Sequence, residues 1–423
     1  MGARRGSRMT KSGAYSRSHA RCMDAGPLRS LIDAFAEELK SNGHTTLTVS
    51  GYEDSARHFA GWLCRSRIGL SQVSEDVAER FARHRCRCPG ARRQDRLSPK
   101  YVRRARRFIR FLVERGIVAT IAPRVPRLID PRVAAYQDWL RRHRGISERT
   151  IDRHGRMIMR LVPSLGADPE AYDAALVRGV ILDEAKRSSR PHVKTMTTAL
   201  RGYLRFLAAA GLCRPSLDRA VPTIPQWRLS ALPRYLPARD VERLIASCDV
   251  SRPHGIRDRA ILLLLARLGL RAGDILSMRL DDIAWGEGTL RVCGKGRREI
   301  RLPLPQDAGD AVLEYLSLAR PRVTHERLFL RSSAPYRPFK TSCAISDVVR
   351  LALKRAGIPD APSRGANLLR HSAATSMLRA GASLDTIGTV LRHRSVDTTA
   401  HYAKVDLAML QQIAQPWPGE ASC

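Results

Sequence analysis

Apolar residues in the first half of the chain recur every three to four positions, in blocks that repeat. The segments FAEELKSNGHTTLTVSGYEDSARHFAGWL at 35–63 and YQDWLRRHRGISERTIDRHGRMIMRLV at 136–162 both predict a helix, a short polar turn and a second helix. Further along, RFIRFLVERGIV at 107–118 aligns with GYLRFLAAAGLC at 202–213, and a glycine ends each predicted helix. We interpret this as a two-copy duplication of an all-helical module, since solenoids need three or more units.

Prolines divide the chain. TIAPRVPRLIDP at 120–131 predicts a linker, and Pro222, Pro225, Pro233 and Pro237 mark a second connection. The N-terminal stretch is basic but has no apolar segment of the kind a signal peptide needs. We therefore expect a flexible basic arm, a first helical module, a second helical module, a third domain and a tail, over residues 1–25, 26–125, 128–228, 236–415 and 416–423.

The pattern changes in the third domain. TLRVCGKGRREIRLPLP at 289–305 predicts a β-hairpin whose GKG supplies the turn. The run AILLLLA at 260–266 stops at Arg267, well short of the roughly 18 apolar residues that span a bilayer, so we expect no membrane segment. The domain is thus predicted to be mostly helical with one small sheet. Its helices are expected at 238–250, 257–268, 307–319, 342–356, 367–380 and 383–391.

The charge of the chain points to a polyanionic partner. Lys and Arg total 74 against 40 Asp and Glu, giving a formal net charge of +34, and only nine of the cations are lysines. Guanidinium groups suit bidentate phosphate contacts, although the base composition of a genome explains an arginine bias equally well. The arginine-rich helix KYVRRARRFIRF at 100–111 is either a solvated face or a DNA-binding face, and we favour DNA.

The cysteines indicate a reducing compartment. The chain has nine, an odd number without a framework of spacings, which favours a cytoplasmic protein without disulfides. His84, Cys86 and Cys88 in RHRCRC lie at alternate positions and lack the two-pair spacing of zinc sites. We therefore expect no metal there and no cofactor elsewhere.

Four local signals in the third domain have ordinary structural readings when each is taken alone. Arg271 follows a helix end, with Asp274 three positions on where it could hold the guanidinium. Lys295 lies at a predicted hairpin tip, Arg370 on an amphipathic helix, and Tyr402 in the turn-rich stretch LRHRSVDTTAHYAKVD at 391–406. Their order and chemistry together favour a catalytic reading.

A tyrosine that attacks a phosphodiester needs the groups that this chain supplies. Its phenol has a pKa of about 10, so attack needs a base or a positive field. Arg271 and Arg370 can neutralise charge on the non-bridging oxygens of the transition state. Lys295 can protonate the leaving 5′-oxygen, and His393 can hydrogen-bond the same phosphate. These cations neutralise the negative charge of the phosphate, so this chemistry does not require a metal ion.

In this order, the motifs resemble the tyrosine recombinase, or phage integrase, family over residues 236–415. LGLRAGDILSMRLDDI resembles the first arginine box, GKGRREIRLPLP the lysine hairpin, and NLLRHSAATSMLRAGASLDTIGTVLRHRSVDTTAHYAKV the second box with the nucleophile. The family pattern H-x-x-R-H has Asn367 at its first position here, and Arg392 replaces a usual glycine. The resemblance implies a catalytic set of Arg271, Lys295, Arg370, His393 and Tyr402, the last as nucleophile, with Asn367 at the departing position.

The resemblance also implies a fold and an activity. We expect duplicated all-helical SAM-like core-binding modules followed by a mixed α/β tyrosine-recombinase catalytic domain, closing around duplex DNA. The expected activity is site-specific recombination through a 3′-phosphotyrosyl intermediate, for integration or transposition of a mobile element. The expected partners are double-stranded DNA, further copies of the chain as a tetramer on two DNA sites, and other recombinases of the same element. The alternatives are a type IB topoisomerase, a weakly catalytic DNA-binding accessory protein and a plain transcription regulator.

Overall fold

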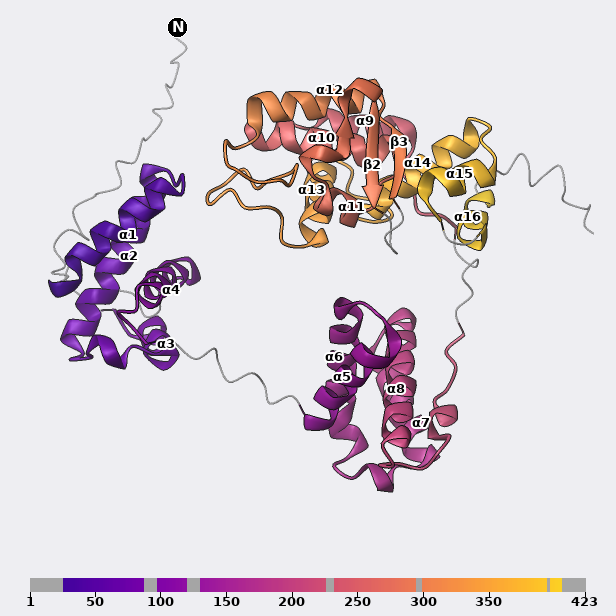
Figure 1. The fold of residues 1–423 in the computed structure, drawn as a ribbon, viewed down its shortest axis with the longest axis horizontal. Coiled ribbons are helices and arrows are strands. Elements are labelled where there is room, and N and C mark those ends of the chain that lie inside the picture. The colour runs from indigo at the N-terminus through magenta and orange to yellow at the C-terminus, as the bar shows by residue number, and fades with distance from the viewer. Residues whose placement is uncertain are drawn as a thin grey trace, which may run out of the picture. The chain divides into compact units, whose positions relative to one another are not determined.

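The computed structural model describes residues 26–86, 97–119, 130–225, 232–293, 299–393 and 396–404. These residues are mostly helical with one three-stranded sheet, as the sequence predicted (Figure 1). The expected basic arm and C-terminal tail lie outside the described residues, as do most of the linker and part of the second connection. Three groups of helices follow one another along the chain, and each is described below by itself.

The first group consists of four helices around an aromatic core. The expected helix, turn and helix within residues 35–63 are confirmed by α1 and α2. Phe35 lies between Phe108 and Phe111 of α4, with ring centroids 5.3 and 5.2 Å away. Ser98 begins α4 by accepting a hydrogen bond from the Tyr101 N–H. The helices are α1 (Arg29–Ser41), α2 (Thr46–Arg65), α3 (Glu75–Arg83) and α4 (Pro99–Glu114).

The second group repeats this plan. The described residues between 121 and 228 form a compact unit. Tyr136 is fully buried, and its hydroxyl donates to the Ala199 carbonyl at 3.1 Å, so α5 is fastened to α8 through the core. The helices are α5 (Pro131–Arg144), α6 (Glu148–Leu165), α7 (Ala174–Arg187) and α8 (Arg190–Ala209).

The repeat found in the sequence corresponds to α4 and α8. Both helices end at a glycine in the left-handed region, Gly116 with φ 69° and Gly211 with φ 72°. The Gly211 N–H donates to the Ala208 carbonyl and the next N–H to that of Leu207, and Gly116 ends α4 in the same way. The aligned Phe and Leu pairs of both copies are buried, so the duplication preserves the same core face.

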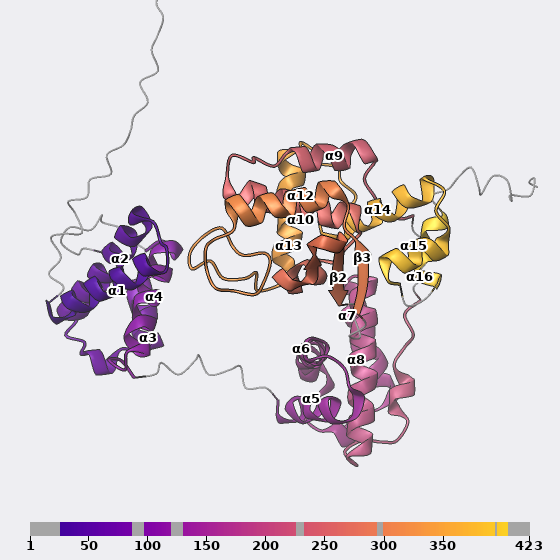
Figure 2. The ribbon, with the colours of Figure 1, turned by 45° about the horizontal axis from the view of Figure 1, so that its top comes forward.

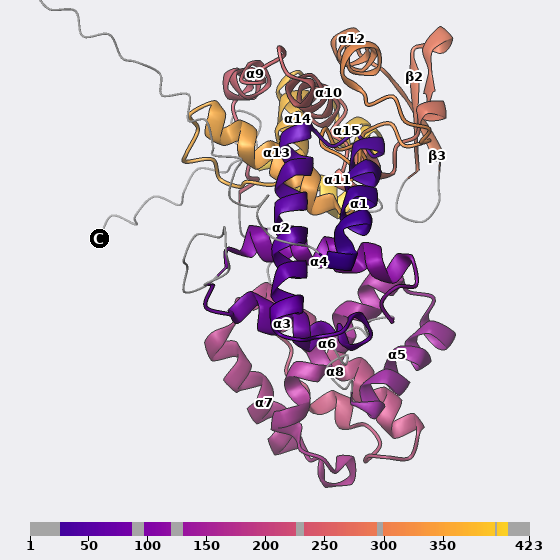
Figure 3. The same cartoon turned by 90° about the vertical axis from the view of Figure 1, so that its left-hand side faces the viewer.

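The third group holds the small sheet and most of the motifs. The expected hairpin is confirmed by β2 (Thr289–Cys293) and β3 (Glu299–Pro303), which pair antiparallel (Figure 3). The short strand β1 (Ile283–Ala284) pairs with the other edge of β2. The helices are α9 (Ala238–Ala246), α10 (Pro253–Arg267), α11 (Ala272–Ser277), α12 (Gln306–Glu314), α13 (Ser342–Arg355), α14 (Asn367–Arg379), α15 (Leu384–Leu391) and α16 (Val396–Ala403). The helix expected at 307–319 changes at Tyr315 into a π-helical turn.

Helix α10 forms the centre of this group (Figure 2). It packs against α9, α12, α13 and α14, and all the residues of the AILLLLA run are buried. The length and apolar character of this run are therefore explained by a core helix. No helix within the described ranges is long and apolar enough to cross a membrane.

Helix α14 connects two cores. Leu368 and Leu369 belong to the main core around α10, whereas Leu378 belongs to a smaller cluster shared with α15 and α16. Tyr402 of α16 is part of that smaller cluster. The packing of α14 therefore sets the distance between the arginine motif and the tyrosine.

The left-handed glycine that ends α8 gives a test of the repeat. Replacing Gly211 with Ala should destabilise the second module by about 1 kcal/mol, because the new methyl group meets open space but the backbone is strained. Replacing Gly179, inside α7 and also facing open space, should stabilise it by about 0.5–1 kcal/mol. Hydrogen exchange of the α8 amides in the full chain measures both. If both substitutions changed the stability of the second module in the same direction, the left-handed conformation of Gly211 would not be what ends α8.

Candidate active site

The first arginine box is organised by one buried carboxylate. Asp274, 7% exposed, accepts a hydrogen bond from the Arg271 backbone N–H at 2.8 Å and so caps α11. The same carboxylate forms an ion pair with Arg392, whose side chain is 4% exposed. Asp274, which the sequence suggested as a support for Arg271, therefore contacts the Arg271 backbone. The same carboxylate is shared with Arg392, 118 positions away in the chain.

Arg392 occupies a conformation that suits glycine. Its φ of 56° places it in the left-handed region at the end of α15, which is consistent with the glycine usual at this position in the family pattern. Its carbonyl accepts a hydrogen bond from Arg271 Nη2 at 3.2 Å. Its Nε and Nη1 are buried and have no hydrogen-bond partner within the part of the chain that the structure describes. Arg392 is thus held by its ion pair with Asp274 despite backbone strain.

Arg370 joins three helices. It is 4% exposed, and it donates from Nη1 to the Gly269 carbonyl at 2.5 Å and from Nη2 to the Leu391 carbonyl. These two carbonyls lie beyond the end of α10 and at the end of α15. Burial, followed by the charge of Arg271, lowers the pKa of Arg370 to about 10. The guanidinium therefore stays charged at neutral pH, next to a second cation.

Tyr402 lies inside this group of cations, and its hydroxyl is paired with a histidine. It is 2% exposed, and its hydroxyl lies 2.8 Å from Nδ1 of His371. Burial raises the pKa of the phenol, while the charges of Arg370 and Arg271 lower it. His371 is not among the catalytic residues predicted from the sequence. Its position beside Arg370 on α14 was the available signal, but only the packing of α16 brings it to Tyr402.

His393 stacks on the tyrosine. The two rings are nearly parallel, at 8°, with centroids 6.2 Å apart. His393 Nδ1 lies 2.8 Å from Thr399 Oγ1 on α16. Burial, then the charges of Arg370 and Arg271, lowers the pKa of His393 to about 4, so the ring is neutral at neutral pH. Its role in this arrangement is that of a hydrogen-bonding group and not of a cation.

The other two predicted site residues are Asn367 and Lys295. Asn367 is exposed at the first position of α14. Lys295 comes between β2 and β3 in the sequence, outside the described residues, so its place in the site stays a prediction. The structure therefore brings together Arg271, Arg370, His393 and Tyr402, and adds His371 and Arg392.

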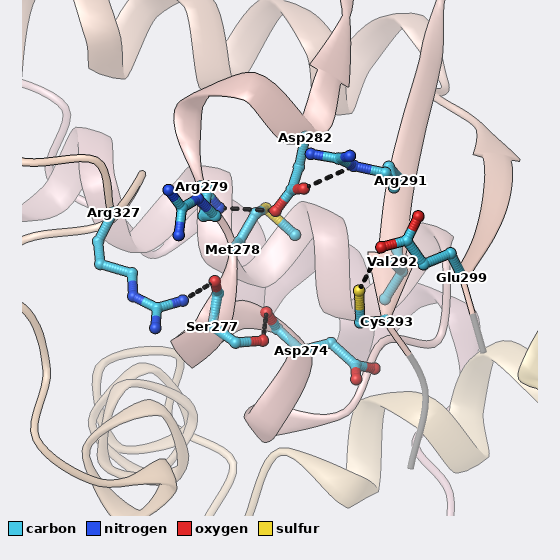
Figure 4. A pocket seen from close by; sticks show the side chains of 10 residues that line it. All are labelled: Asp274, Ser277, Met278, Arg279, Asp282, Arg291, Val292, Cys293, Glu299 and Arg327. Carbon is cyan, nitrogen blue, oxygen red and sulfur yellow. Dashed lines mark hydrogen bonds and ion pairs between the residues drawn. The ribbon is translucent and has the colours of Figure 1, made fainter. Parts of the chain in front are cut away.

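The base of the hairpin is fastened by ion pairs around a pocket next to Asp274 (Figure 4). Arg291 of β2 donates to Asp282 at 3.0 Å, and the carboxylate of Asp282 also accepts from the Arg279 N–H at 2.8 Å. Where the hairpin turn begins and ends, Cys293 Sγ lies 3.5 Å from Glu299 Oε1. The strands that carry Lys295 are therefore fixed to the segment that follows α11.

Comparison with known proteins identifies the family. The model of the phage integrase family matches residues 234–409. Two proteins of Sinorhizobium fredii, named putative integrase/recombinase y4rA and y4rF, are 38% and 32% identical to the chain. Each alignment covers 94% of this chain, with 96% and 93% of the two relatives. The chain belongs to the phage integrase family of tyrosine recombinases.

Solved structures agree with this fold. A lambda integrase fragment (75–356), solved as a dimer bound to a COC′ core site, aligns with a TM-score of 0.53 at 18% identity, over 69% of this chain and 98% of that one. The XerH site-specific recombinase bound to palindromic difH substrate has the same TM-score and identity, over 66% and 83%. At such identities the likeness concerns the fold.

Replacing Arg392 tests the buried ion pair. Arg392→Gly relieves the backbone strain but leaves Asp274 without its cation, and the loss of one partner of a buried pair costs roughly 3–5 kcal/mol. We expect the domain to unfold more easily, as measured by hydrogen exchange of the α14 amides. Arg392→Lys keeps both the charge and the strain, and should lose less stability. A Gly variant as stable as the original chain would show that Asp274 does not need Arg392.

Proposed function

We propose that this chain is a site-specific DNA recombinase that cuts and rejoins duplex DNA through a 3′-phosphotyrosyl intermediate formed on Tyr402. The observation that carries the proposal is the position of the phenol among Arg370, Arg271 and two histidines. We further propose that the reaction integrates or transposes a mobile element, as the names of the integrase relatives suggest.

The two arginines bind the scissile phosphate. Their guanidinium groups neutralise the charge that develops on the non-bridging oxygens as the Tyr402 oxygen bonds to phosphorus. Arg392 is close enough to Arg370 to lower its pKa, but the charge of Arg392 is largely compensated by its ion pair with Asp274. Burial keeps the pKa of the Tyr402 phenol above its usual value, and the charges of Arg370 and Arg271 offset part of that cost before attack.

Histidine and lysine handle the protons. His371, whose burial keeps its pKa below the usual value, accepts the phenolic proton as Tyr402 attacks. His393 donates a hydrogen bond to the phosphate while its other nitrogen pairs with Thr399. Lys295 protonates the leaving 5′-oxygen. The phosphotyrosyl bond retains the energy of the broken phosphodiester, and a 5′-hydroxyl of a second strand then attacks it and releases Tyr402.

This chemistry requires α16 to move. With Tyr402 only 2% exposed, a phosphate of duplex DNA cannot reach the phenol in the described arrangement. Helix α16 packs mainly on α15, and its Tyr402 joins side chains of α14 and α15 in a small apolar cluster, so the displacement has to break the packing on both helices. DNA binding supplies the free energy for this step.

The two helical modules and the chain's high charge support duplex DNA as the partner. In α4, however, three arginines are engaged within the first module: Arg104 with the Gly51 carbonyl, Arg106 with Glu75 and Arg107 with Glu38. The exposed Arg103 and Arg110 are the candidates for phosphate contacts. We propose boundaries of 26–125 and 128–228 for the modules and 236–415 for the catalytic domain.

We also propose an oligomeric state and a cellular location for this chain. Exchange between two duplexes needs four active sites, and we propose a tetramer on two sites, in line with a solved lambda integrase tetramer bound to a Holliday junction. Other recombinases of the same element are proposed partners. The free cysteines that the structure describes are consistent with work in the cytoplasm.

A two-site assay tests the activity. DNA flanking the coding region of this chain supplies candidate sites, placed on one plasmid in direct repeat. A recombinase excises the intervening segment without a nucleotide cofactor. Relaxation of a supercoiled plasmid without excision would instead favour a type IB topoisomerase, and binding without covalent attachment would favour an accessory protein.

Replacing the proposed nucleophile tests the chemistry. Tyr402→Phe should abolish covalent attachment to a nicked suicide substrate, while DNA affinity changes little because only a hydroxyl is lost. Tyr235→Phe is a matched control, since the Tyr235 hydroxyl pairs with Arg379 in the same domain. Denaturing gels resolve the covalent complex. A complex that persists with Tyr402→Phe would exclude this residue as the nucleophile.

Asn367 tests the departure from the family pattern. Asparagine can donate one amide hydrogen bond to a phosphate but carries no charge, whereas histidine can carry one. A charge-assisted hydrogen bond is worth roughly 1.5–3 kcal/mol, so Asn367→His should raise the cleavage rate about tenfold or more. Asn367→Ala should lower it. Single-turnover cleavage at saturating DNA measures all three, and equal rates would place residue 367 outside reach of the phosphate.

A further inference from the structure

Three side chains of metal-binding type lie together in the first module. His58 comes from α2, and His84 and Cys86 follow the end of α3. The ligand atoms of all three lie within 4.8 Å of one another, and His58 and Cys86 are buried. The sequence spacing did not suggest a metal, because His58 lies far upstream of the RHRCRC segment. Cys88 of that segment lies outside the described residues.

The hydrogen bonds around His58 fix its tautomer. The Tyr101 hydroxyl donates its single proton to the Asp54 carbonyl at 3.0 Å. Towards His58 Nδ1, 3.1 Å away, the same hydroxyl oxygen can therefore only accept. The proton of the neutral imidazole is thus on Nδ1, and Nε2 carries a lone pair. That lone pair faces Cys86 Sγ, at 3.4 Å.

His84 is set in the same way. Its Nδ1 lies 2.5 Å from the Phe81 carbonyl, and because a carbonyl oxygen can only accept, Nδ1 carries the proton. Nε2 is then the nitrogen able to bind a metal. Histidines that ligate metals usually donate their other N–H to a carbonyl, carboxylate or similar acceptor, which orients the ring. Both histidines of this cluster have that arrangement before any ion is considered.

The spacing suits zinc. In a tetrahedral site with Zn–S of about 2.3 Å and Zn–N of about 2.0–2.1 Å, sulfur and nitrogen lie about 3.5 Å apart. The distance of 3.4 Å between Cys86 Sγ and His58 Nε2 matches this. A simple hydrogen bond from the thiol to the imidazole also fits that pair, but it gives no reason for His84 to complete the cluster. Imidazole with thiolate is a ligand set that zinc prefers.

We propose that His58, His84 and Cys86 bind one zinc ion that holds the segment after α3 against α2. Two ligands follow α3 and one lies within α2, so the ion closes the chain between residues 58 and 84 and stabilises the first module. The three ligands leave the fourth tetrahedral position for water or another donor. This zinc has no part in the DNA-cleavage chemistry proposed above, and it stands whether or not that chemistry is correct.

Metal content of the full chain tests the site. The chain is produced without a histidine tag in zinc-supplemented medium under reducing conditions, dialysed, and analysed by mass spectrometry for metals. We expect about one zinc per chain, and its loss in Cys86→Ser and His84→Gln. Cys64→Ser is the matched control, because Cys64 is an exposed cysteine of α2, and it should retain the zinc. A zinc-free original chain, or equal zinc in Cys86→Ser and Cys64→Ser, overturns the proposal.

Cobalt substitution separates loss of a ligand from loss of folding. Co²⁺ bound through a thiolate should give a sulfur-to-metal absorption band in the original chain and in Cys64→Ser. The band should be absent in Cys86→Ser, while circular dichroism shows that its helices are retained. EDTA should lower the melting temperature of the first module in the original chain and not in Cys86→Ser. Equal effects of EDTA on both proteins, or no sulfur band in the original chain, would show that Cys86 is not a ligand.

Discussion

The catalytic domain depends on the balance between three guanidinium groups and one buried carboxylate. Burial, and after it the charges of Arg271 and Arg392, lowers the pKa of Arg370 to about 10. Like charges repel more strongly in a protein interior than in water. They stay together because Asp274 neutralises Arg392 and caps the helix that begins at Arg271. A positive field around Tyr402 is therefore part of the folded domain itself.

The same balance fixes how the helices meet. Arg370 donates to carbonyls at the ends of two helices, where the helix dipole places partial negative charge. The cation thus pairs with the carbonyls of Gly269 and Leu391, and these contacts set α14 between α10 and α15. One side chain serves both packing and chemistry, so a change in the packing of α14 moves the cation relative to Tyr402. The buried core around α10 is the support for that position.

The helices and the hairpin were predictable because the hydrophobic periodicity of each segment, and the residues that end it, are local features of the sequence. The glycines at 116 and 211 and the run at 260–266 are of this kind. The order of the motifs also predicted Arg271, Arg370, His393 and Tyr402 as a set, and the structure brings these four side chains together, while their catalytic roles stay a prediction. The sequence did not predict the pairing of Tyr402 with His371, of Asp274 with Arg392, and of His58 with Cys86. These contacts join residues far apart in sequence or on different helices, and only tertiary packing selects them.

The two departures from the family pattern act on the same electrostatic balance in opposite directions. Asn367 removes a side chain that can carry positive charge, and Arg392 adds one next to Arg370. Their effects do not cancel, because the charge of Arg392 is already compensated by Asp274 at ion-pair distance, whereas position 367 is exposed at the start of α14. A compensated charge contributes a weak field beyond its partner. In the proposed mechanism the phosphate would therefore rely more on the directed donors of Arg271 and Arg370 than on the number of cations around it.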